Sequence, residues 1–245
     1  MPEIPPGLPS IAANLERVRA RMAAAAERSG RSPSDIRLVL VTKGRDAELV
    51  RAAYVAGERD FGENRVEEGI PKAAALGDVP DVTWHMIGHI QSRKARQVLP
   101  TYGWVHSVDR MKIARLLSQT AEEHGRRLPA LLECNVSGET TKEGWSLSDP
   151  STWPASLPEL GQVAGFPGLD IRGLMTMAPW TENPEQTRPV FRQLKRLQAF
   201  LCTELGVAWA ELSMGMTDDY EVAIEEGATS VRIGRAVFEL RPGQP

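Results

Sequence analysis

Lys43 stands where a side chain could carry out covalent chemistry. It follows the apolar run at residues 38–41 after a single threonine, at the point where a buried strand would end. A lysine there is usually a solvated charge, because lysine is rarely buried. The alternative is a partly buried amine at the mouth of a sheet, where it could form a Schiff base with a carbonyl compound. The other motifs have to distinguish these two interpretations.

Two glycine-containing turns near the end of the sequence could bind an anion. The segment LSMGMTDDYEVAIEEG (212–227) reads as a strand end, a short turn and a helix, and RIGRAVF (232–238) repeats that order. Backbone N–H groups at helix starts bind phosphate, and a serine hydroxyl nearby would help. Ordinary strand–helix turns remain the alternative. The sequence has no P-loop and no GxGxxG fingerprint, which favours a small phosphate ester over a nucleotide.

A reactive lysine and a phosphate site on one face of a fold are what pyridoxal 5′-phosphate (PLP) requires. Arg232 then needs an explanation, because it interrupts an apolar strand. It could donate to the pyridine nitrogen of the cofactor, and as a permanently protonated group it would keep that nitrogen unprotonated. The alternative for Arg232 is an ion pair with Glu133 or Glu211.

The elements that must position these residues alternate along the chain. Strand-like runs are predicted at residues 36–42, 59–62, 82–88, 103–108, 130–136, 169–177, 209–214 and 230–234. Helices are predicted at 11–29, with Ser10 as its cap, and at 46–57, 109–125 and 183–206, while 146–158 is predicted to be a loop that leads into a helix. The strands are apolar rather than alternating, as in parallel sheets covered by helices. About eight such units favour a single α/β (β/α)8 TIM-type barrel with an N-terminal helix over an open doubly wound sheet.

In such a barrel the functional residues lie at the carboxyl ends of the strands. Besides Lys43, these positions hold Gly62 to Asn64, Gly88 and His89, Asp109 and Arg110, residues 135–138, 177–179 and 213–216, and Gly234 to Ala236. Glycine, serine, asparagine and one lysine therefore gather at one face. That composition suits a small anionic ligand.

The bulk composition excludes several classes of function. A net charge of −3 gives no electrostatic reason to expect nucleic acid or an anionic membrane as partner. Cys134 and Cys202 are far apart, so neither a disulfide framework nor a zinc site is indicated, and Cys134 is expected in the core. No apolar stretch approaches the ~20 residues of a membrane span, and the N-terminus lacks the pattern of a secretion signal. A cytoplasmic location is expected.

Seven short motifs occur in a fixed order along the sequence. They are TKGRD (42–46), FGENRVEE (61–68), WHMIGHIQSRKAR (84–96), HSVDR (106–110), NVSGETTKEG (135–144), RGLMTMAP (172–179) and LSMGMTDDYEVAIEEGATSVRIG (212–234). Together they resemble the pyridoxal phosphate homeostasis protein family over about residues 11–240. The resemblance implies an alanine racemase N-terminal domain-like barrel (fold type III) that binds PLP covalently, as an internal aldimine with Lys43.

The resemblance also implies roles for individual residues. Asn64 would lie near the cofactor ring and Arg232 at its pyridine nitrogen. The phosphate would be held by Ser213 and by the backbone around Met214 and Gly234. Two further residues, His85 and Met86, could pack against the ring. The family often has threonine where this chain has Arg235, whose side chain could supply charge or point to solvent, while its backbone N–H can still serve.

Other polar signals are read as structural, so no metal site is predicted. His85 and His89 are four residues apart but lack the glutamate of an HExxH motif. Ser137 and Gly138, with Lys142, are expected to form a loop that shields the site rather than a catalytic pair.

Three functions compete at this stage. The first is a PLP carrier that buffers or delivers the cofactor with little or no turnover; the second is a fold type III racemase or decarboxylase; the third is a Schiff-base aldolase acting on a phosphorylated sugar. A two-base racemase needs an acid/base opposite the lysine, and in the racemases this sequence resembles a tyrosine from an appended β-domain supplies it. The sequence ends after the barrel, which favours the non-enzymatic carrier.

The carrier hypothesis brings expectations about organisation and partners. Residues 1–10 are expected to be loosely attached, 11–240 to form the PLP-binding barrel and 241–245 to form a tail. The expected partners are PLP, PLP-dependent apo-enzymes and free amino acids, and a monomer is expected. Which apo-enzymes receive the cofactor, and how it is released, cannot be read from the sequence.

Overall fold

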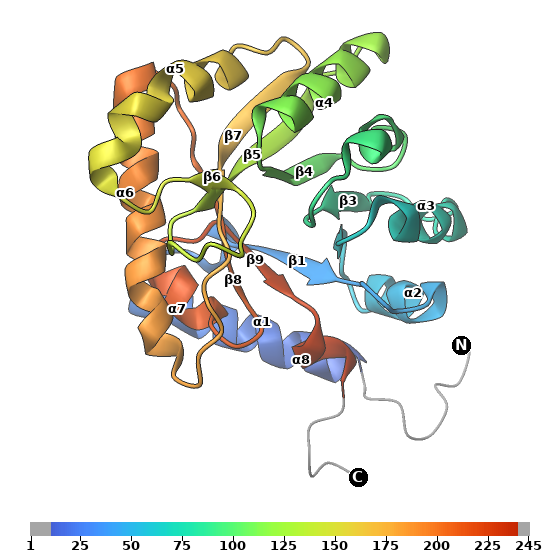
Figure 1. Cartoon of the computed structure of the whole chain (residues 1–245). Helices are drawn as coiled ribbons and strands as arrows, with labels where there is room; N and C mark the ends of the chain where they lie inside the picture. The colour runs from blue at the N-terminus through green and yellow to red at the C-terminus, as the bar shows by residue number, and fades with distance from the viewer. Residues whose placement is uncertain (1–10, 240–245) are drawn as a thin grey trace.

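The computed structural model describes residues 11–239 and shows a closed barrel of parallel strands surrounded by helices (Figure 1). Around the ring the strands follow the order β1-β2-β3-β4-β5-β7-β8-β9, and β9 pairs with β1 to close it. Consecutive parallel strands are each connected by a crossover, as the alternation in the sequence requires. The predicted (β/α)8 fold is confirmed.

All eight predicted strands are present. Their bounds are β1 Arg37–Val41, β2 Asp60–Glu63, β3 Thr83–Met86, β4 Trp104–Val108, β5 Leu128–Asn135, β7 Leu169–Met175, β8 Glu211–Met216 and β9 Ser230–Ile233. A ninth, β6 (Trp145–Ser146), pairs with the end of β5 outside the ring. It was not predicted, because two residues carry no hydrophobic pattern.

The helices agree with the predicted segments except at 146–158, where a helix begins at Trp153 within the predicted loop. They are α1 Ile11–Arg28, α2 Ala47–Val55, α3 Val66–Ala75, α4 Met111–Glu123, α5 Trp153–Ala164, α6 Arg188–Leu205, α7 Tyr220–Glu225 and α8 Arg235–Phe238, with short 3-10 turns η1 Pro33–Asp35, η2 Ser92–Gln97, η3 Pro150–Thr152 and η4 Pro184–Thr187. The segment predicted at 183–206 begins as η4, continues as α6 and ends at Gly206, which has a left-handed φ of 64°. The Ser10 cap and both predicted termini lie outside the described residues.

The barrel wall separates two different layers. On β5, for example, Leu132 and Cys134 belong to the apolar layer between strands and helices, as expected for Cys134. Glu133 lies between them and points the opposite way, into the barrel, because successive side chains of a strand alternate. The interior of the barrel thus carries buried polar residues while the apolar core lies outside it.

The N-terminal helix contacts the strand–helix units from the end and from the beginning of the chain. Asn14 on α1 donates from Nδ2 to the carbonyl oxygen of Val237 on α8, at 2.8 Å. Arg28 on α1 forms ion pairs with Glu221 (3.2 Å) and Glu225 (2.8 Å) on α7. Figure 1 shows α1 running beside α7 and α8. Since α1 also packs against α2, it links the last two strand–helix units to the first. Within the described part of the chain, no helix combines the length and the apolar character needed to cross a bilayer.

Candidate functional site

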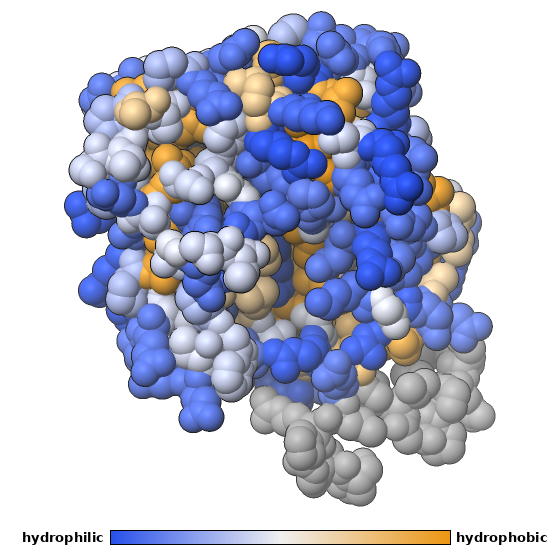
Figure 2. All heavy atoms as spheres, in the orientation of Figure 1, coloured by the Kyte–Doolittle hydropathy of each residue, from blue (hydrophilic) through white to orange (hydrophobic). Residues whose placement is uncertain are grey.

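A cavity of about 260 Å³ opens where β1, β2, β8 and β9 end. This volume is near the lower end of ligand pockets, which suits a small molecule. Figure 2 shows a mainly hydrophilic face with apolar side chains visible inside a hollow at its centre. The lining residues are Val41, Lys43, Asn64, Ile87, Met177, Pro179, Trp180, Thr181, Pro184, Thr187, Met216, Thr217, Asp218, Asp219, Arg232, Gly234 and Arg235.

Five of the eight predicted site residues line this cavity. Lys43 follows β1, Asn64 follows β2, Arg232 is in β9, and Gly234 and Arg235 follow β9. They meet because parallel strands deliver their carboxyl ends to one rim of the barrel. One amine, one amide and two guanidinium groups therefore converge on a single small space.

Lys43 is positioned through the residue before it. The Thr42 hydroxyl donates to Oε1 of Glu63 at 2.6 Å, and Lys72 Nζ donates to the carbonyl oxygen of Thr42 at 2.7 Å. Lys72 also contacts Glu63 Oε1 at 2.5 Å. Gly44 turns the chain after Lys43 with a φ of 67°. The backbone at Lys43 is thus fixed on both sides.

The Lys43 side chain itself is exposed, although partial burial was expected, because it lies at the open rim of the cavity rather than inside the strand layer. Its amine has no hydrogen-bond or ion-pair partner among residues 11–239. An accessible amine without a partner can react with a ligand in the cavity without first breaking a protein contact.

Arg232 reaches the same cavity from inside the barrel, with 4% of the residue exposed. One terminal nitrogen donates to the hydroxyl oxygen of Ser213 at 2.5 Å, and the other donates to the carbonyl oxygen of Thr176 at 2.8 Å. Two contacts in the plane of the guanidinium fix its orientation, and N–H donors remain for the cavity side.

Arg232 carries its charge without an ion-pair partner among the described residues. Burial lowers the pKa of Arg232 to about 10, while the charges of Asp219 and Glu133 act in the opposite direction. Among the described residues, no carboxylate oxygen lies within 4.0 Å of the Arg232 guanidinium nitrogens. Glu211 instead accepts a hydrogen bond from the Thr229 hydroxyl. The alternative of an ion pair with Glu133 or Glu211 is therefore wrong, and Arg232 is a protonated donor held by neutral oxygens.

The turn after β9 is tightly packed. A Cβ atom at Gly234 would come within 2.9 Å of the carbonyl oxygen of Val41, so only glycine allows this turn to lie against the end of β1. Arg235 is exposed and forms an ion pair with Asp218, which links this turn to the turn after β8. The side chain of Arg235 is thus paired at the rim of the cavity.

The turn after β8 contributes residues from the predicted anion-binding stretch that were not assigned to the cofactor individually. Thr217 and Asp219 line the cavity, and Asp219 Oδ1 accepts from the backbone N–H of Met216 at 2.6 Å. Burial raises the pKa of Asp219. The signal for Thr217 was its place directly before a helix, in the stretch already proposed as an anion site. Met177 and Trp180, from the loop after β7, form the apolar rim, and Trp180 is 74% exposed.

Three predicted residues are not at the cavity surface. Met86 and Met214 are fully buried in the layer between strands and helices. Alternation explains this, because their strand neighbours His85 and Ser213 face the barrel interior instead. The Ser213 hydroxyl is used by Arg232 and by His106, whose Nδ1 lies 2.9 Å away. None of these three side chains lines the cavity.

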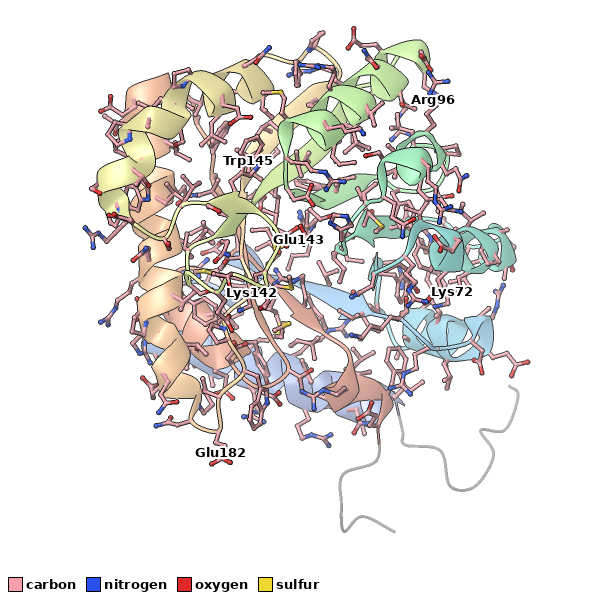
Figure 3. All side chains as sticks on the ribbon, viewed as in Figure 1. Lys72, Arg96, Lys142, Glu143, Trp145 and Glu182 are labelled. Atoms are coloured by element: carbon pink, nitrogen blue, oxygen red, sulfur yellow. The ribbon has the colours of Figure 1, made fainter. Side chains whose placement is uncertain are left out.

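The loop between β5 and β6 crosses the middle of this face, where Lys142 and Glu143 are labelled in Figure 3. Lys142 Nζ donates to the carbonyl oxygen of Met177 at 3.0 Å and pairs with Glu139. Ser137 donates to the side chains of Asn135 and Glu139, not to Lys142. The loop therefore contacts the rim of the cavity, and Ser137 and Lys142 do not form a hydrogen-bonded pair.

The described residues contain one set of potential metal ligands, which was not predicted. Side-chain atoms of His89, Asp109 and Glu143 lie within 4.8 Å of one another. Arg110 already donates to both oxygens of Asp109, at 2.6 and 2.5 Å. Asp109 is thus already held in an ion pair with Arg110. His85, four residues before His89, lies inside the barrel with different partners.

Comparisons with known proteins agree on the fold. The family model "Alanine racemase, N-terminal domain" matches residues 11–242. An alanine racemase structure from Clostridium difficile is 14% identical, with a TM-score of 0.73 over 96% of this chain and 60% of that one. At this identity the likeness concerns the fold alone.

More similar proteins share a name. The pyridoxal phosphate homeostasis protein of Pseudomonas aeruginosa is 42% identical over 95% of this chain and 96% of its own length. That of Aquifex aeolicus is 40% identical over 93% and 96%. PipY of Synechococcus elongatus, in a structure with PLP bound, is 38% identical with a TM-score of 0.78, over 94% of this chain and all of that one.

Proposed function

Because this chain belongs to the pyridoxal phosphate homeostasis protein family, we propose that it binds PLP in the cavity at the end of β1 and carries or buffers it. The observation that supports this most directly is the convergence of Lys43, Arg232 and Gly234 on one small cavity. Bound PLP supplies a reactive aldehyde and an electron-withdrawing ring. The residues of the cavity fit its two polar ends.

Lys43 is the proposed attachment point. Its amine nitrogen would form a double bond to the aldehyde carbon, and the aldehyde oxygen would leave as water. The exposed position of Lys43 and the absence of a partner among the described residues support this role. The hydrogen bonds of Glu63 and Lys72 to Thr42 would hold the attachment point in place.

The remaining lining residues suit the ring and the phosphate. We assign the spare N–H donors of Arg232 to the ring nitrogen and Asn64 to the side of the ring. The phosphate would be held by backbone N–H groups around Gly234 and by Thr217. Arg235 can exchange its carboxylate partner Asp218 for the phosphate. This contact would replace the hydroxyl of the threonine that is common at this position in the family. Met86, Ser213 and Met214 are assigned no direct contact.

A carrier rather than an enzyme is supported by the lack of a tyrosine among the described residues that line the cavity. A racemase needs a second proton-transferring group on the face opposite the lysine. None of the described tyrosines lines the cavity: Tyr54 is in α2, Tyr102 is buried before β4 and Tyr220 is in α7. Delivery to PLP-dependent apo-enzymes, exchange with free amino acids and a monomeric state stay predictions.

Covalent capture of PLP tests this proposal. The purified protein incubated with PLP should gain a visible absorption band, and borohydride reduction should fix a pyridoxyl group on the peptide that contains Lys43. Lys43→Ala should lose the reduced adduct, and the exposed Lys112→Ala should keep it. An adduct on another residue, or none on the native chain, would refute the assignment of Lys43.

Turnover separates a carrier from an enzyme. The PLP-loaded protein should show no racemisation or decarboxylation of a panel of amino acids near about 1 s⁻¹, the lower end of ordinary enzymatic rates. A rate at or above that value for any amino acid would make the racemase or decarboxylase hypothesis the better one.

A further inference from the structure

We propose that Arg232 is positioned by a hydrogen-bond relay that crosses the barrel interior, formed by Asp60, His85, His106, Ser213 and Arg232. This inference rests on the proposed function, since it assigns a positioning role to residues that contact Arg232 rather than PLP. The relay begins at Asp60, at the amino-terminal end of β2, and ends at the cavity on the opposite face of the barrel.

Each link in the relay is a short contact. Asp60 Oδ1 lies 2.8 Å from His85 Nε2, and His85 Nδ1 lies 3.0 Å from His106 Nε2. His106 Nδ1 lies 2.9 Å from Ser213 Oγ, which accepts from Arg232 at 2.5 Å. Five different strands supply these five residues, so the relay exists only in the closed barrel.

The direction of every hydrogen bond follows from its ends. Burial lowers the pKa of both histidines, that of His106 well below 6.5, so each ring is neutral and carries one N–H. The Asp60 carboxylate can only accept, so His85 donates from Nε2 and accepts at Nδ1. His106 must then donate from Nε2 and accept at Nδ1. The Ser213 hydroxyl donates to His106, which leaves its oxygen to accept from Arg232.

Each of the four imidazole nitrogens has one hydrogen-bond partner, and each hydrogen bond has only one possible direction. A negative end at Asp60 and a positive end at Arg232 align all the intervening dipoles. The charged groups near the Asp60 end are Arg37, with Nε 3.7 Å from Oδ1, Glu58, whose Oε1 accepts from the Asp60 backbone N–H at 3.2 Å, and Glu211, whose charge acts on His85. The relay therefore holds the guanidinium plane of Arg232 in one orientation, with its unused donors directed to the cavity.

Histidine tautomers test the relay without any PLP. In the full chain labelled with ¹⁵N-histidine, NMR at pH 7 should show His85 and His106 as neutral Nε2–H tautomers, assigned with His85→Phe and His106→Phe. His89 and His124 lie outside the relay and serve as internal references. A protonated ring or an Nδ1–H tautomer at either position would overturn the proposed relay.

The consequence for PLP is tested by breaking the relay at both ends. Ser213→Ala should weaken PLP binding by about five- to tenfold, the effect of one lost hydrogen bond, and should shift the visible band, whereas Ser213→Thr restores both. Asp60→Asn should also shift the visible band, because it removes the negative end of the relay, although residue 60 lies on the face of the barrel opposite the cavity. The matched control is Ser230→Ala, a buried serine of β9 outside the relay.

The outcomes separate this inference from the proposed function. If Asp60→Asn leaves both the band and the binding unchanged while Ser213→Ala alters them, Ser213 acts only locally and the relay role is refuted. If the native chain forms no band with PLP, the proposed function fails, and the tautomer measurement still decides the relay. That measurement on the native chain also decides it should a variant fail to fold.

Discussion

At the scale of single residues, the pair of Glu63 and Lys72 should matter more for stability than a surface ion pair. Glu63 is fully buried and the Lys72 side chain is 11% exposed. Lys72→Met leaves a buried carboxylate without its cation, so we expect the free energy of unfolding to fall by about 3 kcal/mol. Chemical denaturation measures this loss, and a change below about 0.5 kcal/mol would contradict it.

The double variant Lys72→Met, Glu63→Leu is the control for that experiment. It removes both charges and should recover most of the lost stability. The pKa of Glu63 is already raised by burial, against the effect of Lys72. The loss in Lys72→Met alone should therefore shrink as the pH falls and Glu63 takes up a proton.

Glu133 gives the stability a pH dependence with a defined sign. Burial, with help from the charge of Asp109, raises its pKa from 4.5 to about 7. Between these two values the folded chain binds the proton more tightly than the unfolded chain does. The contribution is therefore fully present below pH 4.5 and is lost as the pH rises through about 7.

Glu133→Gln should remove that dependence. The amide resembles the protonated acid, so the variant should be more stable than the native chain at pH 8, by up to about 3 kcal/mol. The two chains should differ little at pH 4.5. Thermal or denaturant unfolding across this range measures the difference. Parallel curves for the two chains would show that Glu133 keeps an ordinary pKa in the folded state.

At the scale of elements, the end of β8, where it packs against α7, depends on Gly215. Its φ is 93°, and a Cβ atom would lie 2.5 Å from Cβ of Ala223 and 2.9 Å from Cα of Tyr220. Gly215→Ala should cost several kcal/mol, because backbone strain and a clash with backbone add together. The control is Gly206→Ala, where φ is 64° but nothing lies within 4 Å, with an expected cost of about 1 kcal/mol. Equal costs for the two would contradict this.

The elements were predictable because each carries its own local pattern. The eight apolar runs and the amphipathic helices between them sufficed for the fold. β6 was not predictable, since Trp145 and Ser146 become a strand only by pairing with β5. Met86 was expected at the cofactor ring because it stands at a strand end, but sequence position does not reveal which face of the barrel wall a side chain takes. Met214 was expected at the phosphate through its backbone, on the resemblance alone.

At the scale of the whole molecule, α1 should stabilise the barrel through its contacts with the last strand–helix units. Asn14 is 6% exposed and bonds the carbonyl oxygen of Val237. Asn14→Ala leaves that buried acceptor unpaired, so the free energy of unfolding should fall by about 1–3 kcal/mol. The exposed Glu16→Ala is the matched control and should change little. Because alanine is the best helix former, an equal loss in both variants could not come from helix propensity and would mean that the Asn14–Val237 contact is not responsible.

The hydrogen-bonded interior could not be predicted from the sequence, for a reason that concerns the whole barrel. His85, His106, Ser213 and Arg232 were each visible as polar residues in apolar strands, and buried polar groups require partners. Which of them meet depends on strand register and barrel closure. Lys43, Asn64 and Arg232 were predictable because the motifs around them were specific.

The pairing of β1 with β9 has a consequence for biosynthesis. β1, which leads to Lys43, is synthesised before the other strands of the ring, whereas its neighbour β9, which carries Arg232, is synthesised after them. A nascent polypeptide that has emerged only as far as β8 has the lysine but neither the arginine nor the turn at Gly234. The proposed capture of the vitamin B6 aldehyde in its final geometry would therefore have to be post-translational.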